Sequence, residues 1–488
     1  MHTGGPVQRV GDSLARRGEA ALLSFVCRKE GTAIEMDVLN VSAEVVAAIF
    51  GIAVTVVAII VQLAATRFNH QITAMFIRDP INIAVQCFFL ITTLVCIWIA
   101  AVPDLDEQLP FVGISLVTVA LLILLPYFGY VFSFISPLNV INRIGKRAEK
   151  AIDAQVPEKI IGAIDQLQDV TRNAIEQGDR AIALACVSTF CELFDYYQDH
   201  IAEATGDEFG VEDLQQDLDF VSFEPGALLA MVKSHLWFES KILQQFLNIM
   251  RIAAPAMHDV AASLGIAVRR ITVKYGDREE VVGIALRAMN SFLRASLNAR
   301  DARTSYHLLS QYRGIIEVLL KKSDTVTALA AAEHLADYGR LAFAANQPFI
   351  LEVAAFDMAT LVKYAHQHAP DALPGLTTEF LNLDQQSRYE SDEESLLGVR
   401  RSQIQVASYF LQQGEHELVR DIVEDLAAEP SARLRRIVDH LQSENRDLFW
   451  EFTPRGVNFN YLEPEFRPYL DELMGMIGDS RQRQGVAS

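Results

Sequence analysis

The sequence predicts an all-α protein in which three membrane-spanning helices precede a large body of stacked helix pairs. Strongly apolar runs occupy residues 41–65, 81–102 and 111–135, and no comparable run follows. Each is long enough to cross the roughly 30 Å apolar core of a bilayer as a helix. In the remaining chain apolar residues recur three and four positions apart, and no segment alternates with the period of two that is typical of strands. The fold class is therefore a membrane region followed by a solenoid-like helical body.

Residues 1–40 are expected to form a tail with a short helix at the membrane surface. The apolar stretch Ala20–Val26 is too short for a signal peptide, and Arg28 and Lys29 follow it where a cleavage site would need small residues. We therefore expect no cleavable signal here and assign the interfacial helix to residues 18–27.

The connection between the first two spans predicts a second interfacial helix over residues 66–79. Apolar side chains recur there at helical spacing, and polar side chains occupy much of the rest. Asp79 before Pro80 is a typical helix start, because the carboxylate accepts hydrogen bonds from free N–H groups and proline is tolerated at the first helical position. Arg78 and Asp79 could serve this structural role alone, or they could form a site at the inner mouth or a subunit contact.

The same segment carries a resemblance to a known family. The matching residues are Gln62, Phe68, Phe76, Arg78, Asp79 and Asn82. In this pattern the chain resembles the bacterial predicted membrane proteins known as domain of unknown function 2254, and Ile284–Met289 is similar to a second run of that family. It departs from the family at Asn69–Gln71, where Ser-Pro-Arg is usual. The resemblance implies membrane helices followed by a cytoplasmic region, and it implies no particular activity.

Basic residues predict the orientation. The connection 103–110 contains three acidic and no basic residues, whereas the exit from the third span carries Arg143, Lys146, Arg147 and Lys150. Because short cytoplasmic loops are enriched in Lys and Arg, we expect a multi-pass protein of the bacterial inner membrane with its body in the cytoplasm. The four basic residues are expected to contact lipid headgroups, or to act only through this charge rule. The first span is expected to cross fully, with a re-entrant hairpin as the alternative.

The helical body is acidic and is expected to have two lobes. Residues 1–150 contain 11 basic and 11 acidic residues, whereas residues 151–488 contain 31 and 51. So negative a surface repels nucleic acid and excludes it as a partner. We expect a membrane region over 41–138, a first cytoplasmic lobe over 139–222, a main helical domain over 223–445 and a terminal segment over 446–488. Helical periodicity covers residues 160–175, 181–197, 228–249, 281–297, 308–320, 326–343, 349–364 and 406–426.

Two similar turns indicate antiparallel helix pairs. In Ala174–Asp179 and Phe410–Glu415 a glycine follows a helical stretch and precedes an acidic residue. Glycine ends a helix readily in the left-handed conformation, and an acidic residue favours the start of the next helix. Such pairs build α-solenoids, although the sequence shows no strict repeat period.

Neither catalysis nor a cofactor nor a metal is predicted. No phosphate-binding loop, dinucleotide fingerprint, serine elbow or zincin helix occurs. His416 and Glu417 begin like a zincin, but Arg420 occupies the position of the second histidine. His258 beside Asp259 is expected to be a surface pair. The five cysteines show neither disulfide nor zinc spacing.

The carboxyl-terminal segment is expected to dock into an apolar groove. Its aromatic residues are Phe449, Trp450, Phe452, Phe459, Tyr461, Phe466 and Tyr469. Interspersed prolines argue against a long helix, and exposing so many rings would cost on the order of 2 kcal/mol for each. The groove is expected on the chain's own body, as a cap, or on a partner.

Two functions from different classes remain open. The first is a membrane-anchored scaffold or assembly subunit whose helical body binds proteins. The second is a homo-oligomeric channel, because three spans alone cannot enclose a pore. Its candidate lining residues are Thr55, Gln62, Gln86, Thr92, Thr93, Ser115 and Thr118. No span has an ionisable residue near its centre, which weighs against a charged filter. The expected partners are the lipid bilayer and either further copies of the chain or another membrane protein.

Overall fold

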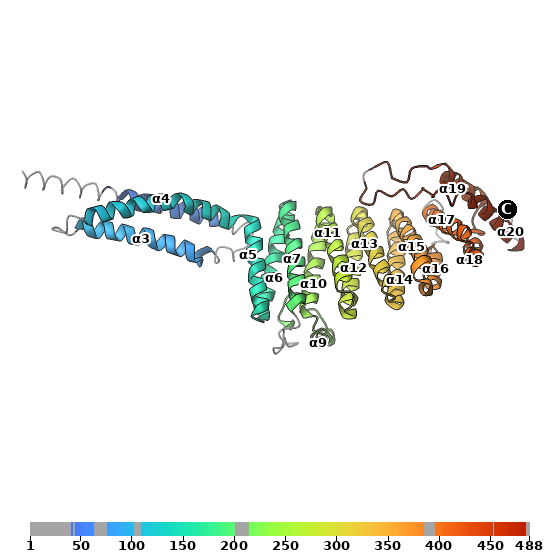
Figure 1. Cartoon of the computed structure of the whole chain (residues 1–488), viewed down its shortest axis with the longest axis horizontal. Helices are drawn as coiled ribbons and strands as arrows, with labels where there is room; N and C mark the ends of the chain where they lie inside the picture. Colours follow the sequence, from blue (N-terminus) through green and yellow to red (C-terminus); the bar gives the residue numbers. More distant parts are fainter. Residues whose placement is uncertain are drawn as a thin grey trace, which may run out of the picture. The chain divides into compact units, whose positions relative to one another are not determined.

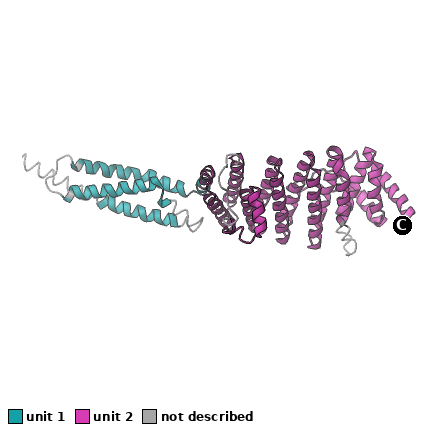
Figure 2. Ribbon diagram, turned by 90° about the horizontal axis from the view of Figure 1, so that it is seen from below, with its two compact units in different colours: residues 1–143 teal, residues 144–488 magenta. Residues whose placement is uncertain are grey.

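The computed structural model describes residues 41, 44–62, 76–101, 109–200, 214–384, 396–451 and 453–484. The chain forms two compact units, Met1–Arg143 and Ile144–Ser488, which Figure 2 shows in teal and magenta. The expected lobes 139–222 and 223–445 and the terminal segment fall almost entirely in the second unit, and their separation stays a prediction. The described residues form helices, 3₁₀ turns and one isolated β-bridge, so the all-α fold class is confirmed.

The first unit contains three helices that are long and apolar enough to cross a membrane. They are Glu44–Gln62, α3 (Pro80–Ala101) and α4 (Leu109–Ile135). Small and aromatic side chains such as Phe89 and Ala120 fill the contacts between them. Large apolar side chains point outward instead: Leu125 is 77% exposed and Trp98 is 71% exposed. An outer surface this apolar is suited to contact with lipid tails. The three expected spans are therefore confirmed as candidate membrane helices.

The second unit is a row of antiparallel helices in two layers (Figure 1). One layer contains α6 (Pro157–Glu176), α10 (Trp237–Ala256), α12 (Glu279–Asn298) and α14 (Thr325–Ala344). The other contains α7 (Arg180–His200), α11 (His258–Lys274), α13 (Ala302–Lys321), α15 (Pro348–His368) and α17 (Leu397–Gln413). The remaining helices are α5 (Pro137–Asp153), α9 (Pro225–Lys233), α16 (Leu373–Leu381), α18 (His416–Leu426), α19 (Ser431–Ser443) and α20 (Tyr469–Gln484). Within the two layers, neighbouring helices of a pair pack on each other and on the next helix of the same layer, as in a solenoid.

One backbone loop recurs throughout this stack. A residue with positive φ follows the end of one helix, and the next helix begins two residues after it. In the loop at Gly178, for example, Gly178 N–H bonds to Ile175 O at 3.1 Å and Asp179 N–H bonds to Ala174 O at 2.7 Å. The positive-φ residues of these loops are Gln155, Gly178, His235, Arg300, Ser323, Asn346 and Gly414. The two glycine turns expected from the sequence are therefore confirmed as members of a larger set.

Three of these loops follow one another at a regular spacing that the residue types do not reveal. Arg300, Ser323 and Asn346 follow one another at intervals of 23 residues. None is glycine, and only Asn346 is of another residue type that favours the left-handed conformation. One expected helix is wrong for the same reason: residues 228–249 form both α9 and α10, because His235 adopts φ 54° between them. The expected stretch 406–426 likewise divides at Gly414 into α17 and α18.

A helix cap within these loops predicts a measurable loss of stability. The Asp324 carboxylate accepts a hydrogen bond from Thr327 N–H at 3.1 Å. Asp324→Ala should lower the free energy of unfolding by about 1 kcal/mol, because the first turn of α14 loses this acceptor. Denaturant titration of the full chain, followed by the fluorescence of buried Trp237, measures the change. The exposed Asp421→Ala is the matched control, and an equal loss there would contradict the assignment.

Candidate functional site

Asp79 lies at the centre of a polar cluster in the first unit. Its Oδ1 accepts hydrogen bonds from Ile81 N–H at 3.0 Å and Asn82 N–H at 3.2 Å, so it caps α3 as expected. The same oxygen accepts the Tyr130 hydroxyl at 2.6 Å. On the other side, Arg143 Nη1 lies 3.9 Å from Asp79 Oδ2. The carboxylate thus connects the start of α3 to the end of α4 and to α5.

Asn82 extends the cluster one helical turn into the membrane region. It is 2% exposed, and its amide donates to Phe76 O at 3.1 Å. Its Oδ1 accepts both the Tyr127 hydroxyl at 2.7 Å and the Gln86 amide at 3.1 Å. Both of these hydrogen bonds therefore come from the chain's own α3 and α4. The arrangement fixes how α3 and α4 pack and leaves no free acid for proton transfer.

Only some of the residues that carry the family resemblance lie in this polar cluster. Asp79 and Asn82 share the cluster, and Phe76 packs edge-on against Phe134 with ring centroids 5.1 Å apart. Gln62 and Arg78 are exposed. Phe68 and most of the expected interfacial helix 66–79 lie outside the described residues, as do the tail 1–40 and its expected helix. Sequence reasoning missed Tyr127 and Tyr130, whose hydroxyls three positions apart in an apolar span were the available signal.

Most polar candidates for a pore bond within their own helix or the cluster. The hydroxyls of Thr55, Thr93 and Thr118 donate to backbone oxygens one turn earlier at 2.8–2.9 Å. Gln86 donates to Asn82 in the cluster described above. The remaining candidates differ in exposure: Thr92 is buried between helices, whereas Gln62 and Ser115 are exposed. Hydroxyls that bond to their own backbone satisfy themselves in lipid and do not require water.

The basic cluster lies on one amphipathic helix, α5. Val140, Ile144 and Ala148 on that helix are buried. Lys146, Arg147 and Lys150 are exposed. Arg143 differs, because its guanidinium lies 3.7 Å from the centre of the Phe134 ring and near Asp79. Arg143 thus belongs to the polar cluster, whereas the side chains of the other three residues are exposed, and their contact with headgroups stays a prediction.

An arginine that the sequence analysis overlooked anchors the carboxyl-terminal segment. The Arg455 guanidinium donates to both carboxylate oxygens of Asp357, at 2.7 and 3.0 Å, and to Tyr306 O at 2.5 Å. Asp357 on α15 is fully buried and also lies 3.2 Å from Arg313 Nε. Figure 1 shows this dark-red segment returning over α13 and α15 before α20 begins. Nothing in its aromatic composition points to Arg455.

The aromatic residues of this segment have unequal environments. Phe459 stacks on Phe356 with centroids 4.6 Å apart, and Gln405 donates to the backbone oxygens of Phe459 and Tyr461. Phe466 is buried against Tyr409. Trp450 is 63% exposed. The remaining members are Phe449 and Tyr469, which are partly buried, and Phe452, which lies outside the described residues. Much of the segment thus lies on its own body, and Trp450 does not.

Deleting residues 446–488 should make the protein aggregate or melt at lower temperature. The deletion removes α20, whose Leu470 and Leu473 are fully buried where this helix packs on α17 and α18. Size-exclusion chromatography and thermal melting measure the effect. Trp450→Ser is the control, because this exposed side chain should leave melting unchanged. A deletion variant that stays monodisperse with unchanged melting would contradict the capping role.

Two histidines of the helical unit, His258 and His366, have structural partners. His258 Nδ1 lies 2.9 Å from Asp301 Oδ2, whereas the neighbouring Asp259 pairs with Arg180. His366 Nδ1 lies 2.9 Å from the Tyr409 hydroxyl. Among the described residues no group of three or more His, Cys, Asp or Glu side chains could hold a metal ion.

The comparisons with known proteins agree with this architecture. No curated protein and no solved structure matches the chain. The model of a family described as predicted membrane protein (DUF2254) matches residues 10–186, a range that contains all three candidate spans and ends within α7. The similar run Ile284–Met289 lies outside the matched range. The match confirms the resemblance drawn from residues 62–82, and over residues 10–186 this integral membrane protein is similar to the DUF2254 predicted membrane proteins.

Proposed function

We propose that this membrane protein is an anchored scaffold or assembly subunit whose helical unit binds protein partners in the bacterial cytoplasm. The observation that carries the proposal is the two-layer stack of helix pairs in residues 144–488. Stacks of this kind present long surfaces to partners. Apolar side chains stand exposed along it, including Ile266 on α11, Val326 on α14 and Phe349 on α15. Partners include further copies of the chain or another membrane protein.

The polar contacts of the membrane unit favour a scaffold over a channel. A water-filled pore needs polar groups that face its lumen. Thr55, Thr93 and Thr118 instead bond to their own helices, and Gln86 bonds to Asn82. These contacts use the polar groups of four of the seven candidate pore-lining residues.

Photo-crosslinking in native membranes distinguishes the two functions. A photoreactive amino acid at Val326, which is 82% exposed, should give discrete adducts heavier than the chain. The same substitution at Arg420, 67% exposed on α18, tests whether adducts are specific to the stack. The purified protein in a planar bilayer should give no conductance. Conductance steps that Thr92→Val alters, together with the absence of Val326 adducts, would overturn the proposal in favour of the channel.

The orientation rests on charge and has its own test. Connection 103–110 lacks basic residues, whereas α5 carries Arg143, Lys146, Arg147 and Lys150. In a variant with Cys27 and Cys87 changed to serine, Asp106→Cys should react with an impermeant thiol reagent in intact cells. Asp421→Cys, exposed on α18, should react only after lysis. The reverse labelling pattern would place the helical unit outside.

A further inference from the structure

A cavity in the second unit has no role in the scaffold. Its volume is about 430 Å³, and it lies between α9, α10, α12 and the turn before α9. Most of its lining is apolar, including Phe220, Phe223, Met231, Leu243 and Ile284. Ligand pockets in proteins commonly have volumes of about 300–1,000 Å³ and this kind of lining. The cavity therefore has the size and polarity of a small-molecule site.

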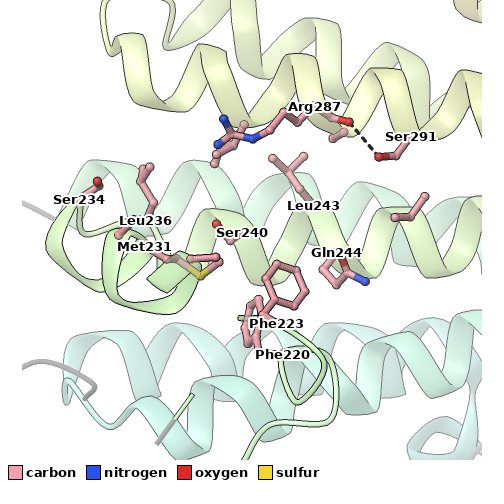
Figure 3. A pocket seen from close by; sticks show the side chains of 15 residues that line it. Phe220, Phe223, Met231, Ser234, Leu236, Ser240, Leu243, Gln244, Arg287 and Ser291 are labelled. Atoms are coloured by element: carbon pink, nitrogen blue, oxygen red, sulfur yellow. Dashed lines mark hydrogen bonds between the residues drawn. The ribbon is translucent and has the colours of Figure 1, made fainter. Parts of the chain in front are cut away.

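A single cation belongs to this apolar cavity. Arg287 extends from α12 toward α10, and Phe220 and Phe223 lie beside α10 (Figure 3). Its side chain is exposed, and within the described part of the chain it forms no ion pair. The hydroxyl of Ser291, which also lines the cavity, bonds to Arg287 O at 2.9 Å and leaves the guanidinium free. An uncommitted guanidinium is suited to a carboxylate or phosphate.

The aromatic wall of the cavity is held by a buried ion cluster. Lys241 on α10 is fully buried, and its Nζ lies 2.6 Å from Asp217 Oδ2 and 2.5 Å from Asp219 Oδ2. It also lies 2.8 Å from Asp165 on α6. Because Asp217 and Asp219 lie three and one positions before Phe220, the cluster fixes the turn that carries the rings. The wall is therefore built in place and does not depend on a ligand.

Large apolar side chains next in sequence to residues near or in the cavity lining are exposed. Leu218 is 89% exposed, Val221 is 65% exposed and Leu229 on α9 is 44% exposed. Soluble surfaces rarely gather large apolar groups around an apolar cavity without a ligand or partner. A ligand with a long apolar part would cover this area as well as fill the cavity.

We propose that this cavity binds an amphipathic anion, with its acyl chain among Phe220, Phe223 and Leu243 and its carboxylate or phosphate on Arg287. Apolar lining matches the chain, and the free guanidinium matches the head. A free fatty acid and an anionic phospholipid share this chemistry. The protein is embedded in a membrane, which supplies both. The proposal stands independently of the scaffold function.

Binding is tested with the full-length protein in an amphipathic polymer, because detergent would compete for the cavity. The probe is anthroyloxy-stearate, which accepts energy from Trp237, the residue after Leu236 of the cavity lining. Palmitate should displace the probe. Arg287→Gln should lower the affinity for palmitate at least tenfold. Methyl palmitate, which lacks the charge, should bind weakly and equally to both proteins. Arg251→Gln, an exposed arginine on α10, is the matched control and should bind as the unaltered protein does.

Two further measurements complete the test. Ala230→Phe places a ring in the cavity from the exposed face of α9 and should abolish palmitate displacement while the melting temperature stays unchanged. In nanodiscs, phosphatidylglycerol with a photoreactive acyl chain should label the peptide containing residues 214–234 if the source is a phospholipid. Labelling elsewhere with palmitate binding intact would identify the free acid. Palmitate affinity that neither Arg287→Gln nor Ala230→Phe changes would overturn the proposal.

Discussion

Replacing Arg455 by methionine should lower the free energy of unfolding of the helical unit by about 3 kcal/mol. The substitution leaves the carboxylate of Asp357 fully buried after it has lost two hydrogen bonds, at 2.7 and 3.0 Å. Removing one partner of a buried ion pair lowers folding stability by about 3–5 kcal/mol, because the other charge stays buried without an opposite charge. Arg313, 3.2 Å from the same carboxylate, keeps the cost at the lower end. Denaturant titration of the full chain measures it.

The double variant separates the lost pair from the stranded charge. Asp357→Asn combined with Arg455→Met should be less destabilising than Arg455→Met alone, since no buried carboxylate remains. Arg420→Met removes an arginine that is 67% exposed and should leave stability unchanged. If Arg455→Met unfolds at the denaturant concentration of the unaltered protein, the segment is not anchored by this pair.

Replacing Lys241 by methionine should lower the free energy of unfolding by about 3–5 kcal/mol near neutral pH. Three carboxylates then face one another around an apolar side chain. In the unaltered protein, burial by itself lowers the pKa of the Lys241 ammonium, but the carboxylates of Asp165, Asp217 and Asp219 outweigh it and raise this pKa above its ordinary value of 10.5. This lysine therefore stabilises the fold fully below pH 10.5, and the contribution is lost as pH rises through the raised pKa.

The pH dependence of the Lys241→Met variant identifies the mechanism. Burial already raises the pKa of the Asp165 carboxyl, and loss of the ammonium beside it should raise this pKa further. A raised carboxylate pKa favours the protonated folded state, so the deficit in unfolding free energy should shrink between pH 7 and pH 5. The exposed Lys321→Met should show no such dependence. A deficit that stays constant over this range would mean that only packing was lost.

Only some of the loops between helices could be predicted from the sequence. Gly178 and Gly414 could be found because glycine is the usual residue for a left-handed helix end. Arg300, Ser323 and Asn346 take the same conformation at a regular spacing, yet of these residue types only asparagine is typical of it. The stacking of neighbouring helices imposes the turn on them. The 23-residue spacing of these loops is therefore visible in the backbone conformation and not in the residue types.

The candidate sites divide in the same way. Asp79 before Pro80 announced a helix start, and the structure has one there. Its partners Tyr130 and Arg143 lie 51 and 64 positions away, and no local pattern connects them. Similarly, seven aromatic residues drew attention to the terminal segment, whereas Arg455 finds Asp357 at a separation of 98 positions.

By itself, the sequence determined the membrane spans, the helical class and the acidic character of the body, because these depend on apolar length, periodicity and charge along a continuous stretch. Only the tertiary structure decided which residues meet. The cluster at Asp79, the pairing of Arg455 with Asp357 and the cavity beside Arg287 each join helices distant in the chain. The physical reason is that a buried charge or cavity wall is defined by what surrounds it, and packing between helices, not local propensity, supplies those surroundings.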